Sequence, residues 1–200
     1  MLLDISRLDA GTVNVKIGTE SVDALMERLK REFAVDAKRK FLTLDCSNDL
    51  HAKIETDIAL FYSAVANCVS NAVRYTDRGR VKVFATRRNA QELWIHVVDT
   101  GRGIPADKLN DIFHEYVRLD REQQSAQGFG LGLAIVKRTA NLLGLTVEVE
   151  SKLGIGSEFR ISVPASRTNA GTGGATTALP GPSMASRTLV GLRVVLVDND

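Results

Sequence analysis

The sequence predicts an α/β fold, a two-layer sandwich in which three helices cover one face of a mixed, mainly antiparallel sheet. Two observations lead to this class. Three segments carry apolar residues at helical spacing, and short segments of strand length lie between them. Four of the short segments follow one another in pairs across brief turns, as antiparallel strands do.

Three helices are expected from the spacing of apolar residues and from capping residues. The first runs from Ser21 to about Arg39. The second begins at Asp57, whose side chain can cap a helix, and runs to Tyr75. The third is LGLAIVKRTANLLG, which Gly144 closes.

Six stretches have the character of strands. They are TVNVKIG (12–18), FLTLDC (41–46), VKVFATRR (81–88), ELWIHVVD (92–99), TVEVES (146–151) and SEFRISVP (157–164). NAQ joins the third to the fourth as a tight hairpin, and KLGIG joins the last two. Residues 100–130 are polar and glycine-marked at both ends, and a loop of this length inside a compact domain is usually functional or mobile.

Both ends of the chain have the character of pieces of neighbouring units. Residues 1–11 have helical spacing and stop at Gly11, so we expect the end of a longer helix. Residues 12–164 form one α/β domain. Residues 165–189 are small, polar and rich in Gly and Pro, which predicts a flexible linker. Residues 190–200 resume as an apolar strand that ends in acids.

Composition excludes some classes of partner. The formal net charge of +2 is too small to indicate a nucleic-acid or membrane surface as a partner. Cys46 and Cys68 have no metal-like spacing and sit among apolar neighbours, as reduced core cysteines of a cytoplasmic protein do. Asp4 argues against a signal peptide, and no apolar stretch approaches the length that spans a membrane.

The first motif that carries chemistry is NCVSNAVRYT, residues 67–76, within the second helix. Asn67 and Asn71 are four residues apart, and Arg74 and Tyr75 follow on roughly the same side. Amide oxygens are hard, neutral ligands that suit Mg²⁺, and an arginine adds a cation that matches phosphate. The alternative is a pair of asparagines that serve as buried hydrogen-bond partners.

The second motif is VVDTGRGIP, residues 97–105, in which an apolar strand ends at Asp99 and two glycines follow. The carboxylate could accept a hydrogen bond from the exocyclic amine of adenine, and Gly101 and Gly103 would let the backbone approach a flat ligand. The alternative is a turn in which Asp and Gly supply local geometry.

The third motif is GFGLGLAIVK, residues 128–137, which opens a helix with Gly128, Gly130 and Gly132. Free amides at a helix N-terminus and the helix dipole favour phosphate. The dinucleotide-binding fingerprint is not met, because it needs a preceding strand and a third glycine where Leu133 stands.

In this order the motifs resemble the ATP-binding catalytic domain of sensor histidine kinases, within the GHKL family that shares the Bergerat fold. NCVSNAVRYT is similar to the N box, DTGRGIP to the G1 box, DIFHEYVRLD to the F box, GFGLGLAIV to the G2 box and GIGSEF to the last glycine box. The resemblance covers about residues 12–164. It implies ATP and Mg²⁺ as cofactors and a mobile ATP lid at residues 102–127, in which Phe113 anchors the loop.

The resemblance also implies roles for individual residues. Asn71 would ligate Mg²⁺, Asp99 would recognise adenine, and Ser157 would reach the adenine through water. The implied nucleotide-binding residues are Asn67, Asn71, Arg74, Tyr75, Asp99, Gly101, Gly103, Ile104, Gly128, Gly130, Leu131, Gly132, Leu133 and Ser157. The implied catalytic residues are Asn67, Arg74 and Arg118, of which Arg118 would reach the γ-phosphate.

Asn67 favours phosphoryl transfer over hydrolysis. Members of the wider family that hydrolyse ATP or phosphorylate serine typically carry Glu four residues before the Mg-binding Asn, as a general base. An amide cannot take a proton at neutral pH, whereas a neutral imidazole is already nucleophilic. Two alternatives stay open: a GHKL-type ATPase, and a degenerate nucleotide-binding or partner-docking module without phosphotransfer, although none of the boxes is broken.

The accepting histidine is expected outside the chain. His96 falls in a strand, His51 in a loop, and His114 in the lid without the continuation of a phosphoacceptor box. MLLDISRLDAG resembles the end of a dimerisation and phosphotransfer domain, which is the expected partner.

The other expected partner is a receiver domain in cis or a cognate response regulator, because LRVVLVDND resembles the first strand of a receiver domain. Asp198 matches its first acid, but Asn199 stands where a second acid is common. The parent would then be a hybrid histidine kinase, from which this chain is an excised catalytic domain.

Overall fold

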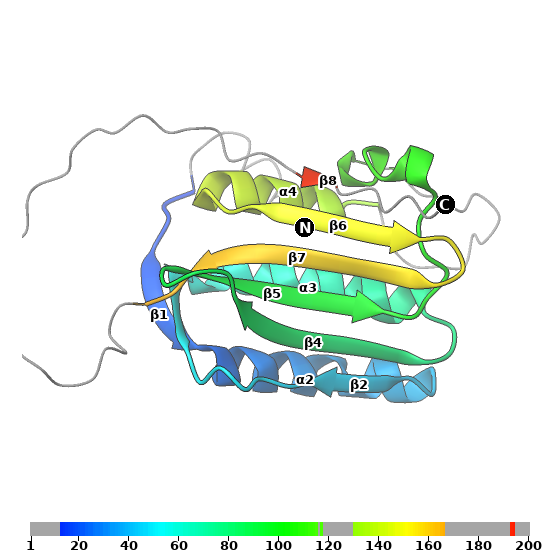
Figure 1. Cartoon of the computed structure of the whole chain (residues 1–200), viewed down its shortest axis with the longest axis horizontal. Helices are drawn as coiled ribbons and strands as arrows, with labels where there is room; N and C mark the ends of the chain where they lie inside the picture. Colours follow the sequence, from blue (N-terminus) through cyan, green and yellow to red (C-terminus); the bar gives the residue numbers. More distant parts are fainter. Residues whose placement is uncertain (1–12, 116, 118–129, 167–192, 195–200) are drawn as a thin grey trace, which may run out of the picture.

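The computed structural model of the 200-residue chain describes residues 13–115, 117, 130–166 and 193–194. This part of the chain has the two predicted layers, a main sheet with three α-helices on one of its faces (Figure 1). The helix expected to end at Gly11 lies outside the described residues, as do Arg118 and Gly128 of the expected site.

The main sheet has the strand order β2-β4-β5-β7-β6-β8. Its strands are β2 Thr43–Cys46, β4 Arg80–Arg87, β5 Glu92–Asp99, β6 Val147–Lys152, β7 Gly156–Pro164 and β8 Arg193–Val194. The three central pairings are antiparallel, whereas β2 pairs with β4, and β6 with β8, in parallel. The prediction of a mixed, mainly antiparallel sheet is confirmed, and so are both predicted hairpins.

A second, two-stranded sheet pairs β1 (Ile17–Ser21) with β3 (Lys53–Asp57). β1 begins later than the strand predicted at residues 12–18, and β3 was not predicted. A signal for β3 is present, because Ile54 and Thr56 are buried while the residues before each of them are exposed. The strand is short and runs directly into the following helix, so its alternation is easily read as part of a loop.

The three α-helices are α2 (Val22–Arg39), α3 (Ile58–Tyr75) and α4 (Gly132–Leu143). The predicted caps Asp57 and Gly144 are confirmed, and Gly144 ends α4 at φ 68°, where a side chain would be strained. The cap of α2 was not predicted: it is the Ser21 hydroxyl, which accepts from Ala24 N at 3.1 Å. Among the described helices, none has both the length and the apolar character needed to cross a bilayer.

The helices and the sheet share one apolar core. Phe61, Val65 and Val69 of α3 are each at most 1% exposed, and α3 lies directly behind β5 and β7 (Figure 1). Ile95 and Val97 point inward from β5 and are equally buried. The core holds the C-terminal end of α3 against the end of β5, which are the two places where the predicted site residues stand.

The described domain continues past Pro164. The Ala165 amide donates to Gln91 O at 2.8 Å, and the Ser166 amide donates to Lys53 O at 2.8 Å. The end of β7 is therefore joined to β3, and the two sheets are connected at this edge.

Substitution of the helix cap Asp57 should lower the stability of the fold measurably. The carboxylate accepts from Leu60 N at 3.1 Å and from Lys16 N at 2.8 Å. Asp57→Ala removes both acceptors, so we expect the free energy of unfolding in urea to fall by about 1–2 kcal/mol. Asp57→Asn keeps one acceptor oxygen, which can still accept from Leu60 N, but it loses the acceptor for Lys16 N, so its loss should be smaller. Equal losses in the two variants would show that the hydrogen bond to Leu60 N does not contribute.

Candidate functional site

Asn67 and Asn71 lie one turn apart on α3, on the side that faces the start of α4. A Cβ atom added at Gly132 would lie 3.1 Å from Oδ1 of Asn67 and 3.8 Å from Nδ2 of Asn71. The Asn67 amide group donates from Nδ2 to Ser63 O at 2.8 Å, which leaves Oδ1 directed toward α4. Glycine at this position lets the first turn of α4 approach the asparagine pair closely.

The first turn of α4 offers its backbone amides to a ligand. The residue before the helix, Leu131, provides no side-chain cap, and no acid stands in the first turn. Leu131 is instead 1% exposed and packs with Ile135, while Gly130 has a positive φ of 69° that turns the chain into the helix. Leu133 packs against the main core. An uncapped N-terminus beside two amide side chains is suited to an anion.

Asp99 ends β5 as a buried carboxylate, 8% exposed. Its Oδ1 accepts from the Gly101 amide at 2.8 Å. Burial raises the pKa of Asp99 above the ordinary 3.8, and hydrogen bonds from Gly101 and from the amide and hydroxyl of Ser157 oppose that rise. Ser157 stands directly across from Asp99 in the β5–β7 pairing. A buried acceptor of this kind suits an amino group on a flat, apolar base.

The end of α3 and the loop after β5 meet backbone to backbone. A Cβ atom at Gly101 would lie 2.4 Å from Tyr75 O and 2.8 Å from Asp99 Oδ1. The Arg102 amide donates to Tyr75 O at 3.4 Å, and the Arg102 guanidinium lies over the Tyr75 ring, 4.6 Å from its centroid. Tyr75 follows Asn71 by one helical turn, so the predicted metal ligand stands one turn before the residue that contacts the loop after Asp99.

The same loop packs on the turn between β6 and β7. Gly103 has φ 69°, and a Cβ atom there would lie 2.0 Å from Lys152 O. A Cβ atom at Gly156 would lie 2.0 Å from Asp99 O. No side chain fits at either place, so these glycines are fixed by close approach of backbone segments.

Two residues that the sequence analysis did not select belong to this neighbourhood. Ser151, half-buried near the end of β6, accepts from the Ile104 amide at 2.8 Å. Its signal is a polar residue at an inward position of a strand whose other inward residues, Val147 and Val149, are apolar. Lys40 donates from Nζ to the carbonyls of α3's last turn, with 2.6 Å to Arg74 O, and no local pattern could have placed it there.

The described residues of the predicted lid pack against the rest of the domain. Phe113 is 2% exposed and packs edge-to-face on Phe159, with ring centroids 6.5 Å apart. Glu115 forms an ion pair with Arg138 of α4. The Arg74 side chain is half-buried and has no acidic partner among the residues that the structure describes, so it is available for an anion.

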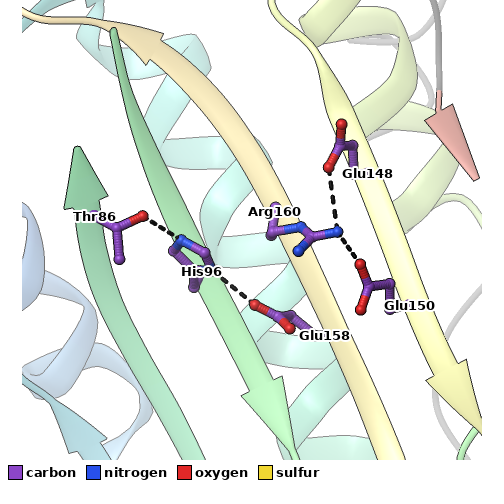
Figure 2. A network of polar contacts seen from close by, with 6 residues as sticks. All are labelled: Thr86, His96, Glu148, Glu150, Glu158 and Arg160. Atoms are coloured by element: carbon purple, nitrogen blue, oxygen red, sulfur yellow. Dashed lines mark hydrogen bonds and ion pairs between the residues drawn. The ribbon is translucent and has the colours of Figure 1, made fainter. Parts of the chain in front are cut away.

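The three histidines have different surroundings. His96 is 9% exposed on the face of the sheet opposite the helices, and it stacks on Phe84. Its Nε2 lies 2.7 Å from the Thr86 hydroxyl and its Nδ1 lies 2.7 Å from Glu158 (Figure 2). His51 and His114 are exposed in loops. Both nitrogens of His96 are therefore engaged, which leaves none for a nucleophilic role.

The cysteines and acids of the described residues form no metal cluster. Burial raises the pKa of Cys68 to about 12 and the pKa of Cys46 to about 11, so both thiols are protonated at neutral pH. No group of three or more His, Cys, Asp or Glu residues within the described ranges could hold a metal ion. The oxygens of the asparagine pair remain the candidate metal donors.

The His96–Glu158 contact predicts an acid-dependent loss of stability. The hydrogen bond from His96 is the main cause that lowers the pKa of Glu158 below the ordinary 4.5, and Arg160 adds to it. A carboxyl with a lowered folded-state pKa stabilises the fold in full above its unfolded pKa and loses that contribution as the pH falls through the lowered value.

We therefore expect Glu158→Gln to lower the free energy of unfolding by about 1 kcal/mol at neutral pH. The difference from the unchanged protein should shrink when unfolding in urea is repeated at pH values below 4.5. A difference that stays constant down to low pH would mean that the charge of Glu158 is not involved.

Residues 56–167 match the family described as "Histidine kinase-, DNA gyrase B-, and HSP90-like ATPase". The chain is 31% identical over 165 residues to the sensor histidine kinase TmoS of Ectopseudomonas mendocina. The aligned stretch makes up 82% of this chain and 17% of TmoS. It is 32% identical over 165 residues to the sensor-like histidine kinase SenX3 of Mycobacterium tuberculosis. That aligned stretch makes up 82% of this chain and 40% of SenX3.

Among solved structures, the chain is similar to full-length ShkA in complex with AMPPNP. The TM-score is 0.75 and the sequence identity is 27%, over 82% of this chain and 34% of ShkA. The chain thus spans less than half the length of each of these relatives.

Proposed function

Because the chain belongs to the histidine kinase-, DNA gyrase B- and HSP90-like ATPase family, we propose that it is the Mg-ATP-binding catalytic domain of a two-component sensor histidine kinase. It transfers the γ-phosphoryl group of ATP to a histidine outside the chain. Two contacts support the proposal: the asparagine pair of α3 lies against the uncapped start of α4, and the last residue of α3, Tyr75, lies against the loop that follows the buried Asp99.

Each side of this site has its own chemistry. Asp99 accepts a hydrogen bond from the amino group of adenine, and Ile104 and Ser157 lie beside it. Arg74 and the first amides of α4 face the phosphates. Positioning and charge neutralisation supply most of the catalysis in phosphoryl transfer, and these residues provide both.

The donor set fits Mg²⁺. Asn67 presents its amide oxygen to the start of α4, and Asn71 presents its amide nitrogen there, so rotation of the Asn71 amide group by half a turn brings a second oxygen to the same place. Mg²⁺ prefers a few protein oxygens together with phosphate and water. We assign Asn71 as the protein ligand and Asn67 as its neighbour. The bound ion would neutralise charge on the phosphates.

Transfer to histidine is favoured over hydrolysis by the chemistry of Asn67. The amide has no basic site, and its nitrogen already donates to Ser63 O. Attack by water needs a base that this position lacks, whereas a neutral imidazole needs little help. The surroundings of His96 also support an acceptor on another domain.

The proposed parent is a hybrid kinase. Residues 1–11 end its dimerisation and phosphotransfer domain, 12–164 are the catalytic domain, 165–189 are a linker and 190–200 begin a receiver domain. The phosphotransfer domain and a receiver domain, in cis or on a cognate response regulator, are the proposed partners. We place the domain in the cytoplasm, where its substrate ATP is found.

Nucleotide titration tests the base and metal sides separately. Asp99→Asn removes a charge-assisted hydrogen bond, so we expect affinity for ADP to fall by roughly tenfold or more in calorimetry. Asn71→Ala should lose most of the Mg²⁺-dependent gain in affinity. Asn141→Ala, at an exposed position near the end of α4, is the control and should bind as the unchanged protein does.

The raised pKa of Asp99 adds a pH dependence to the same titration. The carboxylate must be ionised to accept from the amino group, so affinity should fall as the pH drops, beginning above the ordinary 3.8. Asp99→Asn should show no such dependence. Unchanged ADP affinity in both Asp99→Asn and Asn71→Ala would refute the assigned site.

Labelled ATP tests the reaction. The chain alone, incubated with γ-labelled ATP and Mg²⁺, should gain no acid-labile label and should show little turnover. Strong self-labelling at His114 would overturn the assignment of an outside acceptor. Steady hydrolysis that Asn67→Ala abolishes would establish an ATPase instead.

A further inference from the structure

The Ser151 hydroxyl joins three segments of the chain. Its Oγ accepts from the Ile104 amide at 2.8 Å and lies 2.9 Å from Gly156 O and 2.9 Å from the Ser157 hydroxyl, so its single hydrogen atom is donated to one of these two oxygens at a time. Ile104 belongs to the loop after β5, and the other two partners begin β7. One side chain near the end of β6 therefore links the two walls that flank Asp99.

Ser151 stands where packing alone would favour an apolar residue. Val147 and Val149, the other inward residues of β6, are at most 2% exposed in the core. A polar side chain at the next inward position must find partners, because an unsatisfied buried hydroxyl is costly. Each partner of Ser151 lies beside the proposed base pocket and not elsewhere in the core.

The hydrogen atoms of the two serines have a limited set of directions. Ser157 stands directly across from Asp99 in the β5–β7 pairing, and its side chain lowers the pKa of that carboxyl, as a hydroxyl that donates to it would. When the Ser157 hydroxyl donates to Asp99, the lone pairs of Ser157 Oγ can accept the hydrogen atom of Ser151, which is then not donated to Gly156 O. Without Ser151, that acceptor capacity is unmatched and the Ser157 hydroxyl is free to rotate away.

Ser151 adds a side-chain hydrogen bond to a place where two backbone segments are already in contact. The Gly154 amide donates to Arg102 O at 2.7 Å, so the β6–β7 turn and the loop after β5 already touch. The bond to Ile104 extends this contact by two residues, to the position beside the pocket. Its loss would loosen the loop without removing a core side chain.

We propose that Ser151 is a positioning residue that orients the Ser157 hydroxyl toward Asp99 and holds the Gly101–Ile104 loop, and so sets the affinity and selectivity for an aminopurine base. The proposal rests on the proposed function of the site as a nucleotide pocket. Ser151 acts through Ser157 and Ile104 and does not itself contact the base.

Ser151→Ala tests the proposal by titration of the 200-residue chain with ADP and with a non-hydrolysable ATP analogue. The loss of one or two neutral hydrogen bonds should weaken binding by roughly three- to tenfold. The factor should be the same for both nucleotides, because the change affects the base side and not the phosphates. A loss confined to the triphosphate would contradict the proposal.

Ser162→Ala is a matched control. Ser162 is also a strand serine, 2% exposed, whose hydroxyl accepts a backbone amide, that of Thr146, at 2.8 Å. Its removal should lower thermal stability about as much as Ser151→Ala does, with ADP affinity unchanged. If both variants weaken ADP binding equally, Ser151 has only a structural role and the inference fails.

The selectivity for ADP over IDP distinguishes a loss of orientation of the Ser157 hydroxyl from a general loosening of the loop after β5. IDP lacks the exocyclic amine, so the ratio of ADP to IDP affinity reports the contact with Asp99. This ratio should fall in Ser151→Ala and in Ser157→Ala, fall no further in the double variant, and recover in Ser151→Thr, which keeps the hydroxyl. Additive losses in the double variant, or an unchanged ratio in Ser151→Ala, would overturn the inference.

The starting protein separates this inference from the proposed function. If the unchanged chain fails to bind ADP, the proposed function fails, and the inference with it. If it binds ADP and Ser151→Ala binds with the same affinity and the same selectivity, only the role of Ser151 is refuted.

Discussion

The candidate site depends on keeping the Asp99 carboxylate buried and satisfied at the end of β5. Burial opposes its charge, and hydrogen bonds from Gly101 and Ser157 offset that cost. The donors are in place because three backbone segments meet so closely that Gly101, Gly103 and Gly156 have no room for a Cβ atom. The acceptor of the proposed base site is therefore already buried and held by a hydrogen bond from Gly101 in the absence of a ligand.

A second close approach provides the polar side of the site. Gly132 allows the start of α4 to lie against Asn67 and Asn71, so the amide oxygen of Asn67 and the amide nitrogen of Asn71 lie beside the uncapped start of the helix. The end of α3 connects the two sides, since Tyr75 O accepts from the loop that follows Asp99. Glycine at each contact leaves room for the neighbouring backbone or side chain, so three segments that are far apart in the sequence can lie close together in the proposed site.

The residue chemistry limits what the proposed site can do. Asn67 stands where a general base would be needed for attack by water, and an amide supplies none. On the other face of the sheet, His96 has no free ring nitrogen, because it is stacked on Phe84 and lies between Thr86 and Glu158. Arg160 continues this polar network with Glu148 and Glu150 (Figure 2). The network lies on the opposite face of β5 from the Asp99 side chain.

The sequence by itself determined the three helices, two of their caps and the two hairpins, because helical spacing, Asp57 and Gly144 act through local contacts. It also identified the glycine positions and the asparagine pair. The sequence could not place Ser151 or Lys40, whose hydrogen bonds join residues far apart in the chain. It also missed β3, whose pairing with β1 is a long-range contact. Only the tertiary structure decided which backbones meet, because that depends on the packing of the whole core.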